Sequence, residues 1–195
     1  MPLVAPAPIE SERLLIRLAS EDDLPALLDV NSDPEVTALL PYATWSSLGD
    51  AEAWYRRMQD LQSTGTALQF AIVAKAERRA IGTSLLFRFE AGSARAELGY
   101  VLGRPHWGRG LMREAMTALL GAAFGSMGLR RIEAEVDTRN AASAALLRRL
   151  GFTREGLLRQ RWVAKGHAKD VEIFGLLRDE WPHDLLAPAS VIPAR

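Results

Sequence analysis

Apolar residues recur along the first half of the chain with two different periods, which separate the expected helices from the expected strands. Residues 48–62 carry apolar side chains at helical spacing. Residues 68–74 and 81–89 are short apolar runs joined by a polar turn, as in a pair of strands. Residues 13–18 and 94–102 predict two further strands on the same grounds.

Glycines and prolines delimit the expected elements in the second half. A helix is predicted after Gly110, and Gly125 and Gly128 mark its end. The later elements are a strand at 131–137, a helix at 140–150, a hairpin of 157–163 with 169–177 around Lys165-Gly166, and a short helix from about 178 to near Pro188. Ser20 is expected to cap a further helix near the N-terminus. Strands and helices mixed in this order predict an α/β or α+β sandwich.

The chain has the length of one domain with tails. It has 195 residues, and nothing in its interior resembles a linker or an internal repeat. We take residues 9–186 as one domain. Residues 1–8 and 187–195 are rich in proline and alanine and are expected to be irregular terminal arms.

Composition narrows the classes of function. Formal net charge is zero, so a nucleic-acid binder, which usually carries a basic excess, is not expected. No apolar stretch approaches the roughly 20 residues of a membrane span, and the N-terminus does not resemble a secretory signal. We therefore expect a cytoplasmic protein with no membrane partner. The absence of cysteine excludes disulfides and a cysteine nucleophile, and the three histidines fit no metal-ligand spacing, so no metal is expected.

The candidate chemistry begins at a strand, a glycine-rich turn and a helix start in direct succession. Gly108 and Gly110 permit backbone conformations closed to other residues and remove side chains from the approach path. A helix start also leaves backbone N–H groups without internal acceptors, which favours a phosphate or diphosphate. Arg104, Arg109 and Arg113 add positive charge at its rim. A simple turn without a ligand is the alternative at this point.

Two other nucleotide-binding motifs fit this turn poorly. A Rossmann fingerprint needs a third glycine where this chain has Arg113, and it usually lies in the first βαβ unit rather than past mid-chain. A P-loop needs Gly-Lys-Ser/Thr, which does not follow.

Four segments in the right order resemble the GNAT superfamily of N-acetyltransferases. The segment from Tyr100 to Ala115, with its Trp-Gly-Arg-Gly core, resembles the acetyl-CoA motif, and 140–152 resembles the Asn-x-x-Ser…Leu-Gly-Phe helix. The segments 12–17 and 33–36 and the ending 155–181 resemble the branch that contains the ribosomal-protein N-terminal (alanine) acetyltransferases. The similarity covers roughly residues 10–182.

The resemblance implies a GNAT fold. Such a fold has a central mixed, mostly antiparallel sheet of about seven strands with helices on both faces. Strands four and five splay into a V-shaped cleft for the thioester of acetyl-CoA.

The resemblance also implies the cofactor contacts. Backbone amides of about Arg109 to Arg113 hold the diphosphate, and the strand around Val101 and Leu102 pairs with the pantetheine arm. Asn140 contacts the arm from the other side, and Ser143 lies near the sulfur. The full set of expected cofactor-binding residues is Val101, Leu102, Trp107, Gly108, Arg109, Gly110, Leu111, Met112, Arg113, Asn140 and Ser143.

This chain departs from the family pattern at three positions. Trp107 stands where Gln or Arg is frequent, and Met112 replaces a small residue, both where the backbone does the binding. Leu147 stands where many relatives carry a tyrosine general acid, so that acid is absent.

Glu97 and Ser143 are the expected catalytic residues. An amine near neutral pH is mostly protonated, so a base is needed, and we expect Glu97 to act directly or through a water. A surface carboxylate paired with an arginine is the alternative interpretation of Glu97. Glu133, Glu135 and Asp137 are the other candidate bases. Ser143 is expected to bond the departing sulfur or give it a proton, although a helix N-terminal serine explains it equally well.

The sequence predicts an N-acetyltransferase that moves an acetyl group from acetyl-CoA to a primary amine in a ternary complex. The acceptor is a protein N-terminal α-amine or a small-molecule amine, and aromatic residues are expected to line its end of the cleft: Tyr42, Trp45, Trp54, Tyr55 and Trp162. A homodimer is one expected assembly. Two alternatives stay open, a non-catalytic acyl-CoA sensor of the same fold and a nicotinamide-dependent Rossmann enzyme.

Overall fold

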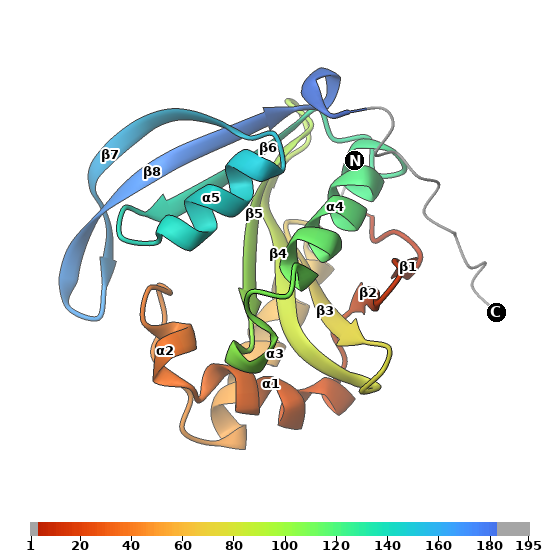
Figure 1. Cartoon of the computed structure of the whole chain (residues 1–195), viewed down its shortest axis with the longest axis vertical. Coiled ribbons are helices and arrows are strands. Elements are labelled where there is room, and N and C mark those ends of the chain that lie inside the picture. The colour runs from red at the N-terminus through yellow and green to blue at the C-terminus, as the bar shows by residue number, and fades with distance from the viewer. Residues whose placement is uncertain (1–3, 183–195) are drawn as a thin grey trace.

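One open sheet runs through the whole structure, a computed structural model that describes residues 4–182 (Figure 1). Its strand order is β1-β2-β3-β4-β5-β6-β8-β7, and every neighbouring pair is antiparallel except β5 and β6. The strands are β1 (Ile9–Glu10), β2 (Leu14–Leu18), β3 (Leu68–Ala74), β4 (Arg79–Glu90), β5 (Arg95–Leu102), β6 (Arg131–Asp137), β7 (Thr153–Ala164) and β8 (His167–Leu177).

Helices cover both faces of this sheet. The α-helices are α1 (Leu24–Asn31), α2 (Pro34–Thr37), α3 (Leu48–Ser63), α4 (Leu111–Phe124) and α5 (Ala141–Arg149). Three 3₁₀ turns complete the elements, η1 (Glu21–Asp23), η2 (Arg104–His106) and η3 (Arg178–Glu180). No helix within residues 4–182 is both long and apolar enough to cross a membrane.

Strand alternation divides the interior into two layers. In β3, Phe70 and Ile72 join the large core under α4 and α5, whereas Ala71 and Val73 join a smaller core under α1 and α3. All seven residues of β3 are buried, as expected of a strand covered on both sides.

The sheet opens between β5 and β6. These two parallel strands pair only from Arg95 to Glu97 with Arg131 to Glu133, and then they diverge (Figure 1). From Leu98 to Leu102, β5 has no strand partner on this side among the described residues. The first five predicted strands are β2 to β6, so the fourth and fifth of them are β5 and β6. The predicted splay between these two strands is therefore confirmed.

The remaining element predictions are confirmed with two corrections. The two-residue β1 was not predicted and makes the sheet eight strands wide instead of about seven. Of the short helix predicted from about 178 to near Pro188, the structure has a 3₁₀ turn at Arg178–Glu180, and the rest lies outside the described residues. Residues 4–8 have no helix or strand, while the predicted arm at 187–195 lies outside the described residues.

Gly82 allows β4 and β5 to approach closely beside the splay. A Cβ atom at this position collides with the carbonyl oxygen of Val101 and lies 3.0 Å from the Cα of Leu102. We expect Gly82→Ala to lower the free energy of unfolding by about 1–3 kcal/mol, because two strand backbones must separate. Urea unfolding measures this loss. Gly156→Ala in β7 is the matched control, since its Cβ meets no atom within 4 Å, and an equal loss in both variants contradicts the explanation.

Candidate active site

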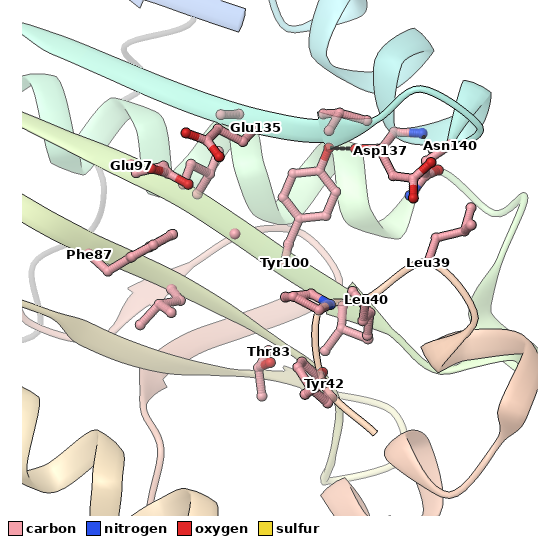
Figure 2. A pocket seen from close by; sticks show the side chains of 18 of the residues that line it. Leu39, Leu40, Tyr42, Thr83, Phe87, Glu97, Tyr100, Glu135, Asp137 and Asn140 are labelled. Atoms are coloured by element: carbon pink, nitrogen blue, oxygen red, sulfur yellow. Dashed lines mark hydrogen bonds between the residues drawn. The ribbon is translucent and has the colours of Figure 1, made fainter. Parts of the chain in front are cut away.

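A cavity of about 290 Å³ lies at the splay of the sheet. Its walls come from the segment after α2, from α3, from β4, β5 and β6, and from the start of α5 (Figure 2). Trp162 of β7 also contributes. The cavity therefore draws on both faces of the sheet, and the open edge of β5 runs between them.

Glu97 lies in the wall of this cavity. It is buried at 8% exposure, and its Oε2 accepts a hydrogen bond from Arg88 Nη1 at 2.7 Å. Burial raises the pKa of the Glu97 carboxyl, and the negative charges of Glu135 and Glu133 add to the rise, against the lowering by Arg88. Glu97 is therefore paired with an arginine, as the alternative interpretation expects. Its carboxylate nevertheless faces a cavity and has a raised pKa.

The other candidate bases are held by cations. Glu133 is paired with Arg95 and Arg131 and does not line the cavity. Glu135 lines it but accepts from Arg161 Nη2 at 3.0 Å.

Asp137 also lines the cavity, and Arg139 donates to it from three nitrogens, the backbone N–H, Nε and Nη2. These hydrogen bonds hold the pKa of Asp137 below its usual value, against desolvation. A carboxylate with a lowered pKa is a weaker base, so Asp137 is less suited to this role than Glu97, whose pKa is raised.

Asn140 and Ser143 meet at the start of α5. The Asn140 Oδ1 accepts from the Ser143 backbone N–H at 3.0 Å, so Asn140 caps the helix as its residue type predicts. Both side chains line the cavity. The Asn140 amide nitrogen has no acceptor among the described residues, which leaves a donor for a ligand.

Tyr100 was not predicted as a functional residue. Its hydroxyl lies 2.7 Å from the Ser143 Oγ, and Tyr100 lines the same cavity (Figure 2). Desolvation raises the pKa of Tyr100 to about 12, against the hydrogen bond with Ser143. In the sequence, Tyr100 occupies one of the alternating apolar positions of a predicted strand, which are typical of core residues. Only the fold brings it to α5. Leu147, at the position of the missing tyrosine, is fully buried and lies outside the cavity wall.

The glycine-rich turn presents a row of free backbone donors. Gly108 and Gly110 adopt φ values of 69° and 76°, and Gly110 is the N-cap of α4. No backbone N–H from Gly108 to Arg113 has an acceptor within residues 4–182, and the first helical bond runs from Glu114 to Gly110. This is the arrangement that favours a phosphate group.

A carboxylate and an arginine hold this turn in place. Glu114 accepts from the Arg13 backbone N–H at 2.7 Å, from the Arg13 Nε at 2.6 Å and from the Ser11 hydroxyl at 2.7 Å. Arg13 Nη1 in turn donates to the Arg109 carbonyl at 3.1 Å. Since a peptide is planar, fixing this carbonyl turns the Gly110 N–H to the opposite side.

Two expected contributions to this region are different in the structure. Arg104 does not face the turn as a free charge, because its Nε donates to Asp33 Oδ2 at 2.7 Å. The Leu102 carbonyl accepts from the Trp107 indole at 2.7 Å, so it is already engaged within the protein. Trp107 therefore fastens the turn to the end of β5, while Arg109 and Arg113 are exposed at the rim.

The expected aromatic wall is present in part. Tyr42, Trp54 and Trp162 line the cavity, whereas Trp45 and Tyr55 pack in the core under α1 and α3. The tip of the β7–β8 hairpin reaches α2, because Lys165 Nζ donates to the Thr37 carbonyl at 2.7 Å.

Comparison with known proteins places this site in a family. The family model described as an acetyltransferase (GNAT) domain matches residues 13–153. The chain is 39% identical over 171 residues to the uncharacterised N-acetyltransferase p20 of Bacillus licheniformis, covering 88% of this chain and 96% of that protein.

Two further relatives have named substrates. The [ribosomal protein uS5]-alanine N-acetyltransferase of Escherichia coli (strain K12) is 28% identical over 182 residues, covering 89% of this chain and 92% of that one. The solved structure of RimL, a ribosomal L7/L12 alpha-N-protein acetyltransferase in complex with coenzyme A, has a TM-score of 0.80 at 25% identity and covers 89% of this chain and 99% of that one.

Proposed function

Because the chain belongs to the GNAT acetyltransferase family, we propose that it moves an acetyl group from acetyl-CoA to a primary amine by direct attack in a ternary complex. The observation that carries the proposal is the cavity at the splay. It joins a buried carboxylate, an open strand edge and, on the far side of that edge, a pair of hydroxyl groups.

The diphosphate of the cosubstrate binds the turn before α4. The free N–H groups from Gly108 to Arg113 supply the donors, and the exposed Arg109 and Arg113 add charge. The pantetheine arm lies along the open edge of β5, to which it pairs as a strand would. The Gly103 N–H donates to the Ile81 carbonyl of β4, so alternation turns the backbone groups of Val101 toward β4 and those of Tyr100 and Leu102 toward the open edge. Asn140 donates to the arm from the α5 side. Leu102 contributes through its side chain or N–H, since its carbonyl is bound by Trp107.

The amine enters between Tyr42, Trp54 and Trp162 and gives its proton to Glu97, directly or through a water. A raised pKa suits Glu97 to this task, because it brings the base closer to the operating pH. A backbone N–H near Val101 stabilises the negative charge on the thioester oxygen. Orientation of the two reactants in one cavity supplies much of the acceleration.

The acceptor is a protein N-terminal α-amine or a small-molecule amine. The similarity to the uS5-alanine and L7/L12 acetyltransferases supports the first class, since the chain covers nearly the whole of both proteins. A non-catalytic acyl-CoA sensor is the second candidate, and the apolar Leu147 at the position of the usual tyrosine acid favours it.

Release of free thiol from acetyl-CoA separates these two functions. The acceptor panel consists of peptides with free N-terminal alanine or serine, the same peptides with blocked N-termini, spermidine and single amino acids. We expect thiol release with at least one free amine and none with the blocked peptides. Saturable acetyl-CoA binding without turnover on any amine would contradict catalysis and support the sensor.

A further inference from the structure

Tyr100 and Ser143 form a pair that joins the two elements on either side of the splay. Tyr100 comes from β5 and Ser143 from the first turn of α5, and their hydroxyl oxygens are 2.7 Å apart (Figure 2). The position of Ser143 is fixed further by the hydrogen bond that its backbone N–H donates to Asn140 Oδ1 at 3.0 Å. Both residues line the cavity, and the base Glu97 makes no hydrogen bond with either of them among the described residues.

Glu97 and Tyr100 point to opposite faces of β5. They are three residues apart, so alternation along the strand separates them. Tyr100 packs against the core under α4 and α5, whereas Val101, which shares the face of Glu97, packs with Val30 and Val36. A thioester on the open edge of β5 therefore has the base on one side and the hydroxyl pair on the other.

We propose that Tyr100 is a positioning residue for the departing sulfur of coenzyme A and acts through Ser143. The inference rests on the proposed function and deepens it. Tyr100 donates its hydrogen to the Ser143 Oγ, which directs the Ser143 hydrogen toward the sulfur. Hydrogen bonds in such a chain polarise one another, so the Ser143 donor is stronger than a single serine hydroxyl.

The step balances without an added reactant. The nitrogen lone pair forms the C–N bond, the C–S bond breaks, and its electron pair goes to sulfur. The amine proton goes to Glu97 and then to solvent. The sulfur leaves as a thiolate that accepts the Ser143 hydrogen bond, and solvent supplies the proton of the free thiol.

Tyr100 keeps its proton throughout this step. Burial holds the pKa of its phenol at about 12, whereas a thiol such as that of cysteine has a reference pKa of about 8.5. Transfer of the phenol proton to the thiolate is therefore uphill, and stabilisation by hydrogen bonding is the role that the site supports. It also replaces the tyrosine that is absent at Leu147, from a different element of the fold.

The test is Tyr100→Phe, which keeps the ring and removes the hydroxyl. We expect kcat to fall about 10- to 100-fold, because without Tyr100 the Ser143 hydroxyl is no longer directed at the sulfur and its hydrogen bond to the charged thiolate is lost. The dissociation constant for acetyl-CoA, measured by calorimetry, stays within about twofold, because the thioester sulfur carries no charge before reaction. Ser143→Ala is expected to match this loss, and the double variant to add nothing to it, since both residues act as one unit.

The pKa of the thiol of bound CoA gives a readout that a packing defect does not move. Ultraviolet titration of the thiolate in the complex should show that Tyr100→Phe raises this pKa by about one unit. Tyr42→Phe is the matched control. Tyr42 is another partly buried tyrosine of the cavity, and its hydroxyl donates to Asn31 Oδ1 at 2.8 Å. Removal of this hydroxyl should leave the thiol pKa unchanged.

The outcomes separate the inference from the proposed function. Normal CoA binding and turnover with an unaltered thiol pKa in Tyr100→Phe contradict the role of Tyr100 alone. A loss of acetyl-CoA affinity with unchanged kcat does the same, since it assigns the hydroxyl to ground-state binding. Failure of the wild-type protein to bind CoA contradicts the proposed function itself.

Discussion

Replacement of Glu97 by glutamine is expected to lower kcat by about 10²–10³-fold, within the roughly 10²–10⁴-fold that a positioned general base contributes. Glutamine keeps the size of the side chain and can still pair with Arg88, but it accepts no proton. The dissociation constant for acetyl-CoA should not change, because the cosubstrate binds along the edge of β5 and at the turn before α4. Steady-state kinetics at saturating acceptor measures the first quantity, and calorimetry the second.

The pH dependence of turnover tests the same role of Glu97. Burial raises the pKa of Glu97 above its ordinary value, and only the deprotonated carboxylate is active. Activity of the wild type should therefore fall as the pH decreases through this raised pKa, and Glu97→Gln should lose this limb of the profile. The limb caused by protonation of the amine itself remains.

Glu133→Gln is the matched control for the loss of a nearby negative charge. Glu133 lies on the paired part of β6, outside the cavity, and its charge contributes to the raised pKa of Glu97. The control should keep its turnover and move the acid limb to lower pH. If the acid limb of Glu97→Gln equals that of the wild type, Glu97 is not the base.

Replacement of Gly110 by valine is expected to weaken acetyl-CoA binding by about 10²-fold. Gly110 has a φ of 76°, a left-handed conformation that a β-branched residue adopts only under strain. A Cβ here has room, with Arg13 Nη2 at 3.7 Å as the nearest atom, so strain in the backbone is the main effect. Relief of this backbone strain must rotate the peptides that present the N–H groups from Gly108 to Arg113.

Gly128→Val controls for backbone strain alone. Gly128 has a φ of 67° beyond the end of α4, and its Cβ meets no atom within 4 Å. Both variants should lose similar free energy of unfolding, while only Gly110→Val should lose affinity in a titration with acetyl-CoA. Equal affinity of the two variants contradicts the assignment of the diphosphate to this turn.

Local patterns were sufficient to predict the elements that hold the site. The alternation along β5 and β6 and the glycines around α4 set element positions through short-range backbone preferences. The splay between β5 and β6 was predicted from the resemblance to one family, because no local pattern encodes it. The helix cap at Asn140 follows from the residue type, and the structure shows it in that role with its amide still available.

The contacts between distant segments could not be predicted in this way. Tyr100 meets Ser143 across 43 positions of sequence, and Arg13 reaches Glu114 across 101. Such pairs depend on how α4 and α5 pack on the sheet, and their residue types occur equally in solvated or core positions. Arg104 shows the reverse case, because it pairs with Asp33, the N-cap of α2, and not with the diphosphate to which the local sequence assigns its charge.

Binding of the diphosphate by the main chain at Gly108 to Arg113 is the central claim, and calorimetry on the folded wild-type protein tests it most directly. The titrants are CoA, acetyl-CoA and S-acetylpantetheine, which has the same arm and thioester but no diphosphate. We predict saturable heat with one equivalent of CoA or acetyl-CoA and at least about 100-fold weaker binding of S-acetylpantetheine. Absence of heat with CoA and acetyl-CoA, or equal affinity for all three titrants, would contradict the account.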